Sequence, residues 1–250
     1  MKYSCLLLFL LLPLLNSCKP KTGAKIHDNF EGDTLNAIWT NDKFLPGAFK
    51  IQSHFVRSGK SAAILTLQKG DQIKEEKGTE LERAELKESK KLMAFENKVY
   101  VYSFSILLPK GFPISPERLV IAQWKQNCKS GNCNPDNPIL ALRYNSGIFR
   151  ITLQVGPDKI TLFRRTDSII NNWMDFKFKI KFSRNPDGRI KTWLNGKEII
   201  DYSGVTAYSE TYGYPLPGNF YFKIGLYRDQ MPQTMNIYID DYEKQELEKW

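Results

Sequence analysis

The sequence predicts an all-β protein, a sandwich of two antiparallel sheets of the jelly-roll kind. Short runs that alternate apolar and polar residues, or that are rich in β-branched and aromatic residues, recur along the chain between turn sequences. They follow one another without long helical segments, which argues against parallel βαβ units. The 250 residues are 42% hydrophobic and 13% aromatic, enough for one packed core. Eleven such runs in one domain favour two packed sheets.

The expected strands can be given in chain order. They are SAAILTLQ (61–68), TELERAELKE (79–88), VYVYSFSILL (99–108), RLVIAQWKQ (118–126), ILALRYN (139–145), IFRITLQV (148–155), KITLFRR (159–165), DFKFKIKFS (175–183), IKTWLNG (190–196), FYFKIGLYR (220–228) and MNIYIDDYE (235–243). Turn signals separate them, among them PKGFP, VGPDK, NPDG, LNGK and YPLPGN. We find no internal repeat and no interdomain linker.

The N-terminus reads as a targeting segment. MKYSCLLLFLLLPLLNSC has a lysine and then an apolar run that is too short and too proline-broken to span a bilayer. LLNSC resembles a bacterial lipobox, which implies a signal peptide over 1–17 and a lipidated Cys18. An ordinary signal peptide with a chance cysteine is the alternative. We therefore expect a tether over 18–24, a β-domain over 25–250, and an exported bacterial lipoprotein, facing the periplasm or the cell surface, that meets the membrane only through its anchor.

The net charge is positive. It is +9 for the whole chain and +8 once Lys2 leaves with the signal peptide. A basic exported protein favours acidic partners, namely nucleic acid, anionic lipid or acidic polysaccharide. The basic residues are scattered among the strands and never form a run of five or six, so we expect no nucleic-acid partner.

Two cysteines remain in the predicted mature domain, Cys128 and Cys133 in NCKSGNC. An oxidising compartment and a glycine-containing loop favour a disulfide between them, worth about 2 kcal/mol for so small a ring. A metal site would need more ligands, and the only histidines, His27 and His54, are distant in sequence. We expect no metal at these cysteines.

Three expected strands have one apolar face and one hydrogen-bonding face. Their polar faces carry, in chain order, Arg83 and Glu85, then Gln123 and Lys125, then Tyr221, Lys223 and Tyr227. Side by side, these strands would floor a groove with cationic and hydrogen-bonding groups. Gly225, in the same phase, would let a ligand ring approach the backbone.

These stretches carry a family resemblance. Arg83-Ala84-Glu85-Leu86, Gln123-Trp124-Lys125 and Tyr221-Phe222-Lys223-Ile224-Gly225-Leu226-Tyr227 resemble the signature strands of the jelly-roll polysaccharide lyases. Those are the family 7 alginate lyases and the related heparin lyase I and glucuronan lyase families. SFSILLPKGFP followed by RLVIAQW is most similar to the heparin lyase I and glucuronan lyase branch. The resemblance covers most of the mature chain and implies a concanavalin-like sandwich with a concave binding groove.

The resemblance implies a lyase that cleaves a uronic-acid polysaccharide by β-elimination. Such an enzyme removes the C5 proton, which lies alpha to a carboxylate, so donors must hold that carboxylate and stabilise the enolate. Arg83 and Gln123 suit this task by donor geometry. Tyr227 matches the tyrosine to which the family assigns proton transfer, and nearby cations would favour its phenolate. Further substrate contacts are expected from Lys223, Glu85, Tyr221, Arg143 and Tyr144.

Lys125 departs from the family pattern, because a catalytic histidine stands at that place in the resembling families. A lysine can hold a carboxylate but cannot copy the donor-and-acceptor pair of a neutral imidazole. Three interpretations follow. Tyr227 acts as both base and acid while Lys125 helps to hold the carboxylate; or another histidine, His54, enters the site; or the protein binds a glycan at the cell surface without cleaving it.

A different enzyme class also has some support. DNFEGDTLNAIW resembles the opening of family 16 glycoside hydrolases, whose retaining chemistry needs two carboxylates about 5 Å apart. ELERAE offers Glu80, Glu82 and Glu85, but Arg83 and Ala84 intrude and the middle aspartate of the usual E-x-D-x-x-E strand is missing. No cofactor is required by either chemistry; the lyase resemblance allows calcium, although no Asp-rich loop demands it. Lys177, Lys179 and Lys181 of DFKFKIKFS are expected on a solvated strand face, with an extension of the groove as the alternative.

Overall fold

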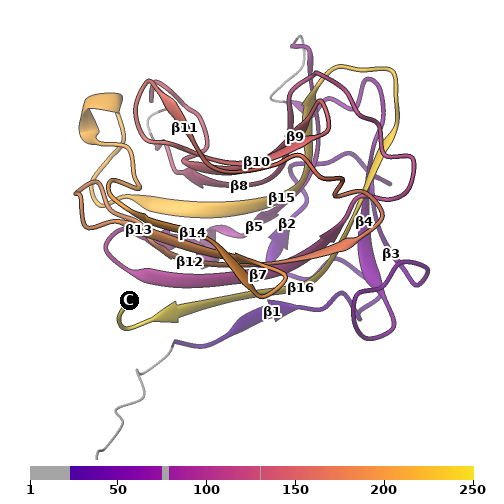
Figure 1. The fold of residues 1–250 in the computed structure, drawn as a ribbon, viewed down its shortest axis with the longest axis horizontal. Helices are drawn as coiled ribbons and strands as arrows, with labels where there is room; N and C mark the ends of the chain where they lie inside the picture. The colour runs from indigo at the N-terminus through magenta and orange to yellow at the C-terminus, as the bar shows by residue number, and fades with distance from the viewer. Residues whose placement is uncertain (1–22, 75–78, 130) are drawn as a thin grey trace, which may run out of the picture.

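The computed structural model describes residues 23–74, 79–129 and 131–250. The predicted signal peptide and the lipidation site Cys18 lie outside the described residues. The described chain folds into two stacked antiparallel sheets of eight strands each, which confirms the predicted all-β sandwich (Figure 1). We call them the back sheet and the groove sheet. The described residues also form two short 3₁₀ turns, η2 (Lys90–Leu92) and η3 (Glu210–Tyr212).

The back sheet follows the order β14-β13-β12-β7-β16-β4-β3, with β1 beside β16. Its strands are β14 (Lys197–Ser203), β13 (Arg189–Leu194), β12 (Trp173–Lys181), β7 (Val99–Leu107), β16 (Met235–Leu247), β4 (Ala62–Leu67), β3 (Phe49–Gln52) and β1 (Ile26–Asp28).

The groove sheet follows the order β11-β10-β9-β8-β15-β5-β2, with β6 beside β15. Its strands are β11 (Lys159–Arg165), β10 (Ile148–Gln154), β9 (Leu140–Asn145), β8 (Leu119–Gln126), β15 (Asn219–Asp229), β5 (Leu81–Glu88), β2 (Trp39–Thr40) and β6 (Ala94–Phe95). In Figure 1 this sheet lies above the back sheet and bends upward toward its ends.

The core lies between the sheets and is rich in aromatic rings. Phe222 of β15 packs against Trp124 of β8 with ring centroids 4.7 Å apart, and Trp124 meets Phe178 of the back sheet at 4.6 Å. All three side chains are buried. Because strand side chains alternate between faces, burying these residues forces their polar neighbours onto the outward faces of the two sheets.

All eleven predicted runs form strands. The sequence did not predict β1, β2, β3, β6 and β14. Four of these have two to four residues, too few to show a period of two. The fifth, β14, follows the LNGK turn directly and pairs with β13 through a register shift, which interrupts its alternation.

The lysines of β12 lie on the outer face of the back sheet. Lys177, Lys179 and Lys181 alternate with the buried Phe176, Phe178 and Ile180. They therefore do not extend the groove, which belongs to the other sheet. Within the described ranges, no helix is long and apolar enough to cross a membrane.

Candidate active site

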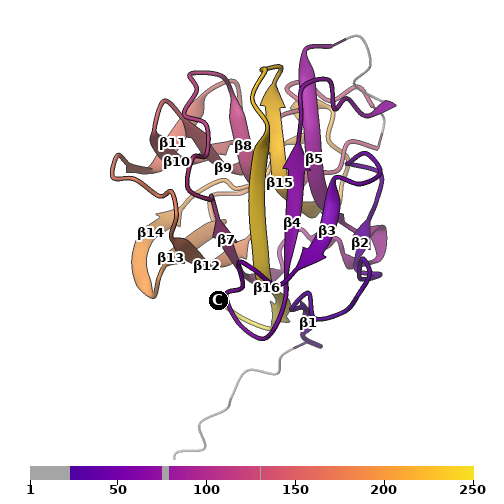
Figure 2. The same ribbon diagram turned by 90° about the vertical axis from the view of Figure 1, so that its right-hand side faces the viewer.

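The three polar strands are neighbours, as the sequence predicts, and their order in the sheet is β8, β15, β5 (Figure 2). One row of residues crosses the groove sheet. Tyr227 of β15 pairs with Arg83 of β5 on one side and with Val120 of β8 on the other, and Val120 pairs with Arg143 of β9. Tyr227 is thus in register with two arginines that are far apart in sequence.

Position 225 needs a glycine because the neighbouring strand β5 lies too close for a side chain. Its φ is +145°, and a Cβ atom there would lie 2.2 Å from the carbonyl oxygen of Ala84 and 2.8 Å from the Cα atom of Glu85. The expectation that this glycine makes room for a ligand ring is corrected, because the backbone of β5 fills that space. The glycine still serves the site, since it permits the irregular pairing through which β15 presents Tyr227.

A buried carboxylate organises the middle of the groove. Glu85 has no exposed surface. It forms ion pairs with the Nε of Arg83 and the Nζ of Lys223, each at 3.0 Å, and it accepts a hydrogen bond from the Nε2 of Gln123. Burial works to raise the pKa of Glu85, but the Lys223 and Arg83 charges and the Gln123 hydrogen bond together hold it below its usual value. Gln123 was expected to donate to substrate, whereas here its amide fixes Glu85.

The pKa of Lys223 is strongly lowered. Burial lowers its pKa to about 8, and repulsion from Arg83 and Lys125 acts in the same direction, while Glu85 opposes the shift. The structure therefore brings together Arg83, Glu85, Gln123 and Lys223 as one polar network.

Tyr227 is surrounded by cations. Its ring centroid lies 4.1 Å from the Cζ of Arg83, 5.2 Å from the Cζ of Arg118 and 5.9 Å from the Nζ of Lys223. Nearby positive charge favours the anionic form of an acid such as a phenol. Positive charge thus lies beside the Tyr227 ring, and Arg118 is a source of it that the sequence did not predict.

The groove next to Tyr227 holds more positive charge than the sequence suggested. A hollow of about 110 Å³ is lined by Tyr227, Val120, Gln123, Asn137 and Pro138, by the cations Arg83, Arg118, Lys125, Arg143, Lys159 and Lys223, and by one acid, Asp136. Burial and the charge of Arg118 lower the pKa of Arg143. Burial and the charges of Arg143 and Arg118 lower the pKa of Lys159. These cations repel one another, so an anion bound among them would be stabilised.

Arg118 and Lys159 were not predicted as site residues. Arg118 directly precedes β8, and Lys159 is the first residue of β11, three strands away in the sheet. Their only sequence signal is a basic residue at a strand end, which many surface strands share. Arg143 was predicted, and it does line the hollow.

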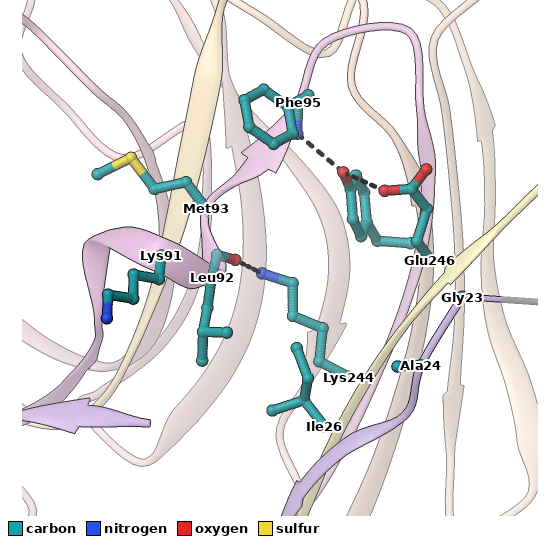
Figure 3. Close-up of a pocket in the computed structure, with 10 residues that line it drawn as sticks. Gly23, Ala24, Ile26, Lys91, Leu92, Met93, Phe95, Lys244 and Glu246 are labelled. Atoms are coloured by element: carbon teal, nitrogen blue, oxygen red, sulfur yellow. Dashed lines mark hydrogen bonds between the residues drawn. The ribbon is translucent and has the colours of Figure 1, made fainter. Parts of the chain in front are cut away.

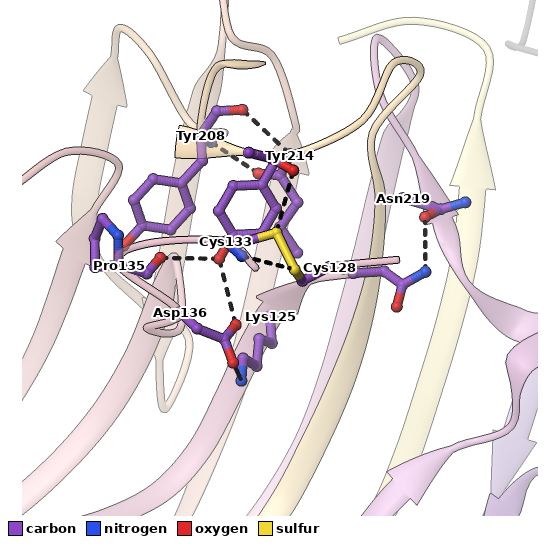
Figure 4. Close-up of a disulfide and its surroundings, with 11 residues drawn as sticks. Lys125, Cys128, Cys133, Pro135, Asp136, Tyr208, Tyr214 and Asn219 are labelled. Atoms are coloured by element: carbon purple, nitrogen blue, oxygen red, sulfur yellow. Dashed lines mark hydrogen bonds and ion pairs between the residues drawn. A yellow bond between two sulfur atoms is a disulfide. The ribbon is translucent and has the colours of Figure 1, made fainter. Parts of the chain in front are cut away.

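Lys125 is held by a loop that a disulfide closes. Its Nζ lies 2.7 Å from the Oδ2 of Asp136, whose Oδ1 accepts a hydrogen bond from the hydroxyl of Tyr214 at 3.4 Å (Figure 4). The predicted disulfide between Cys128 and Cys133 is confirmed, with the two Cα atoms 5.9 Å apart. Asp136 was not predicted, and it balances the charge of Lys125 in the free protein.

The remaining predicted residues lie in different places. Tyr221 shares the groove face, and its ring lies 5.6 Å from the Nζ of Lys87. Tyr144 is 3% exposed and packs in the core against Phe112, so the structure does not bring it to the groove. His54 lies in the exposed turn after β3, and His27 lies on β1. Both β3 and β1 belong to the back sheet. Neither histidine can replace the one missing at Lys125 in this structure.

The carboxylates of ELERAE do not form the pair of catalytic carboxylates that a retaining glycoside hydrolase needs. Glu82 points between the sheets, where it pairs with the buried Arg228 at 2.8 Å. Glu85 points into the groove, on the opposite face of the same strand. Glu80 precedes β5 and is exposed. Two carboxylates on opposite faces of a strand cannot flank one glycosidic bond.

A second hollow lies at the back sheet, where the chain enters β1, and several of its polar groups are paired within the protein. Figure 3 shows the Nζ of Lys244 directed at the carbonyl oxygen of Leu92, and a hydroxyl that links the amide of Phe95 to Glu246. That hydroxyl belongs to Tyr100. Among the described residues, no group of three or more histidine, cysteine, aspartate or glutamate side chains is placed to hold a metal ion.

Comparisons with known proteins bear on the family and the fold. A family model described as polysaccharide lyase matches residues 27–243. An endo-β-1,4-glucuronan lyase from the fungus Trichoderma reesei has 16% identity and a TM-score of 0.65, over 90% of this chain and 95% of that one. An alginate lyase solved with an alginate trisaccharide has 13% identity and a TM-score of 0.58, over 88% and 97%.

A third structure is the catalytic domain of a glycoside hydrolase family 131 protein from Coprinopsis cinerea. It has 13% identity and a TM-score of 0.55, over 81% of this chain and 80% of that one. No curated protein matches the chain. At these identities the solved structures show a shared fold, and that fold serves both lyases and a hydrolase.

Proposed function

Because the chain belongs to the polysaccharide lyase family, we propose that it cleaves an acidic, uronic-acid-containing polysaccharide by β-elimination. The observation that carries this proposal is the cluster of cations around Tyr227 in the groove. Glu85, Asp136 and Asp229 pair with four of these six cations, so an excess of positive charge remains, which a polymer with carboxylates on its sugar rings would offset.

The substrate carboxylate is held by the cations on the β9 side of Tyr227. Arg118, Arg143 and Lys159 line the hollow together, and an anion bound there would offset their mutual repulsion. Neutralising the carboxylate makes the C5 proton more acidic, because the charge that develops in the enolate is delocalised onto the same oxygens.

Tyr227 moves the proton. Its phenolate takes the proton from C5, the electron pair of that C–H bond forms the C4–C5 double bond, and the C4–O bond to the leaving sugar breaks. The phenol then donates the same proton to the leaving oxygen, which returns Tyr227 to the phenolate. One residue thus serves as base and acid, so no histidine is needed.

The other predicted residues support this step in different ways. Glu85 fixes Arg83 and Lys223 beside the Tyr227 ring, and Gln123 holds Glu85 from β8. Lys125 contacts a carboxylate of the polymer after Asp136 gives way, because both anions compete for the same ammonium group. No step of this mechanism passes through calcium or another cofactor.

The test is an ultraviolet assay against a panel of polyuronates, with Tyr227→Phe as the variant. The lyase product carries a new double bond conjugated to a carboxylate, so it absorbs where the substrate does not. We expect turnover by wild type and a loss of at least ~10²-fold in Tyr227→Phe, the usual worth of a positioned acid or base. Substrate affinity should stay nearly the same, since one hydroxyl is removed with little volume.

A second candidate function is glycan binding without cleavage, which the exchange of the family histidine for Lys125 favours. Polymer binding without any ultraviolet product, across the whole panel, would support it and overturn the lyase. Lys125→His restores the family residue, and gain of product by that variant would place the lost activity at this position. Turnover that is unchanged in Tyr227→Phe would instead leave a lyase whose proton transfer lies elsewhere.

A further inference from the structure

A stripe of basic and aromatic side chains crosses the outer face of the back sheet. The two sheets are stacked in Figure 1, so this outer face is on the side of the molecule opposite to the groove. It follows β12 and β13. Cross-strand register places Lys177 opposite Trp193, Lys179 opposite Lys191, and Lys181 opposite Arg189. Two of these three pairs set like charges directly against each other, which destabilises a sheet unless something offsets the repulsion.

The protein's own acids offset only part of this charge. Lys191 pairs with Asp201 at 2.9 Å and Glu198 at 3.4 Å, and Lys181 pairs with Asp187 at 2.6 Å. Within the described part of the chain, no acidic side chain forms an ion pair with the remaining three cations, Lys177, Lys179 and Arg189. Burial and the charges of Lys191, Lys177 and Arg189 lower the pKa of Lys179, which agrees with a local excess of positive charge.

The same three cations lie over indole rings. The Nζ of Lys177 is 5.6 Å from the Trp193 ring centroid. The Nζ of Lys179 and the Cζ of Arg189 are 4.8 Å and 5.7 Å from the Trp250 ring centroid. Both rings are half-buried. Each end of the stripe therefore combines a flat apolar ring with positive charge, the two features that a sugar ring with a carboxylate can use together.

One end of the stripe is hollowed. Trp193 and Lys177 line an open depression of about 370 Å³ with Ser103 and Asp175. The carboxylate of Asp175 is neutralised by Arg57, through an ion pair of 2.8 Å, and it also accepts a hydrogen bond from Ser105. An acidic ligand in this depression would meet the indole and the ammonium group without facing an unpaired negative charge.

We propose that Lys177, Lys179, Arg189, Trp193 and Trp250 form a second binding site for an acidic polysaccharide chain, on the face opposite to the groove. The class of ligand rests on the proposed function. The exposed part of each half-buried indole would contact a sugar ring. The cations beside them pair with carboxylates spaced along the chain.

A linear chain fits this face better than a membrane does. The stripe is one pair of strands wide, and acidic side chains lie on both sides of it: Glu198 and Asp201 on β14, paired with Lys191, and, beyond β7, Glu243 on β16, paired with Lys25. A flat anionic surface that reached Lys177 and Lys179 would also press against those carboxylates, whereas a single chain can run between them. Lipid with anionic headgroups is nevertheless a distinct outcome that the experiment must separate.

The test compares two triple variants with the same loss of charge. Lys177→Gln, Lys179→Gln and Arg189→Gln remove the stripe cations. Lys50→Gln, Lys60→Gln and Lys69→Gln are the control, because these exposed lysines lie on or beside β3 and β4, toward the other edge of the back sheet. The readout is retardation of each protein in gels that contain polyglucuronate or alginate, with a neutral β-glucan for comparison.

We expect the stripe variant to lose affinity for the polyuronate by roughly tenfold, since several exposed ion pairs of modest strength are removed together. The control should bind as wild type, and both should cleave a short oligosaccharide with an unchanged kcat/KM. A groove variant, Arg143→Gln with Lys159→Gln, should lose cleavage and keep stripe-dependent retardation. That retardation reports the stripe even when no substrate is cleaved, so failure of the lyase and failure of the stripe give different results.

Two results would overturn the proposal. The stripe variant and the control could be retarded equally by the polyuronate, which would leave the groove as the binding site. Alternatively, the stripe variant could lose binding to phosphatidylglycerol vesicles while its polyuronate binding stays at the wild-type level, which would assign the stripe to an anionic membrane. Circular dichroism and thermal unfolding of both triple variants establish that each remains folded.

Discussion

Lys223 is the residue whose charge state most directly links pH to binding in the groove. Burial lowers its pKa to about 8 from an ordinary value of 10.5, so in the folded protein it loses its proton as the pH rises through about 8. Between these two values the unfolded chain holds more protons at this lysine than the folded protein does. Its contribution to the free energy of unfolding therefore increases with pH in that window.

The same titration predicts weaker binding of a polyuronate above about pH 8. Loss of the Lys223 charge leaves Glu85 less compensated and reduces the positive potential beside Tyr227. The dissociation constant, measured in the Tyr227→Phe background so that turnover does not intrude, should rise as the pH goes from 7 to 9. Lys223→Arg should abolish this rise, because a guanidinium keeps its charge throughout that range. An equal rise in both proteins would assign the titration to another group.

At the scale of elements, the disulfide loop after β8 positions Asp136 against Lys125. The amide of Asn134 donates to the carbonyl oxygen of Tyr212 at 3.1 Å, and the Tyr214 hydroxyl donates to that of Pro135 at 3.0 Å, so the loop is docked on the segment after η3. Cys128→Ser with Cys133→Ser should lower the free energy of unfolding by about 2 kcal/mol. It should also weaken the Lys125–Asp136 pair, because the loop that carries Asp136 loses a constraint.

The measurements are a denaturant titration for stability and an affinity comparison at fixed salt. Thiol counting on the unfolded, unreduced wild type should find no free thiol from this pair of cysteines. If the double serine variant changed neither stability nor the affinity for a polyuronate, the loop would hold its shape without the bridge, and the disulfide would have no role in the site.

The elements also show what could be predicted from the sequence and what could not. The long strands were predictable because their period of two is written in consecutive residues, and the phases of Arg83, Lys125 and Tyr227 follow from it. Lys159 joins the hollow beside Tyr227 through the packing order of five strands, and Arg118 joins it through the pairing of β8 with β15. No local sequence pattern records either arrangement. The role of Gly225 was misread because its close contact is with Ala84, a residue far away in the chain.

Tyr144 is a residue that the sequence predicted in the groove and that the structure places in the core. Its neighbour Arg143 points into the groove, so strand alternation sends Tyr144 into the core, where it meets Phe112. Choosing both members of an adjacent pair as groove residues conflicts with a period of two. Which of the two residues faces the groove became clear only from the pairing of β9 with β8.

At the scale of the whole molecule, the positive charge predicts that binding depends on salt. The described cations gather on both outward faces of the sandwich, in the groove and along the stripe. Affinity for a polyuronate should therefore fall as sodium chloride rises from 50 mM to 500 mM, while affinity for a neutral β-glucan should be low and should not change. Titration calorimetry at several salt concentrations checks this. A salt-independent affinity would mean that hydrogen bonding, not charge, holds the polymer.

The two sheets are stacked back to back, so their outward faces point in opposite directions. A short oligosaccharide can occupy one face or the other, but only a chain long enough to pass around the edge of the sandwich can occupy both. For such a chain the second contact is intramolecular and benefits from a high effective concentration. With both faces in use, avidity would make the protein favour long polymers over short fragments, and two separate chains held at once would turn each molecule into a crosslink within a polyuronate gel.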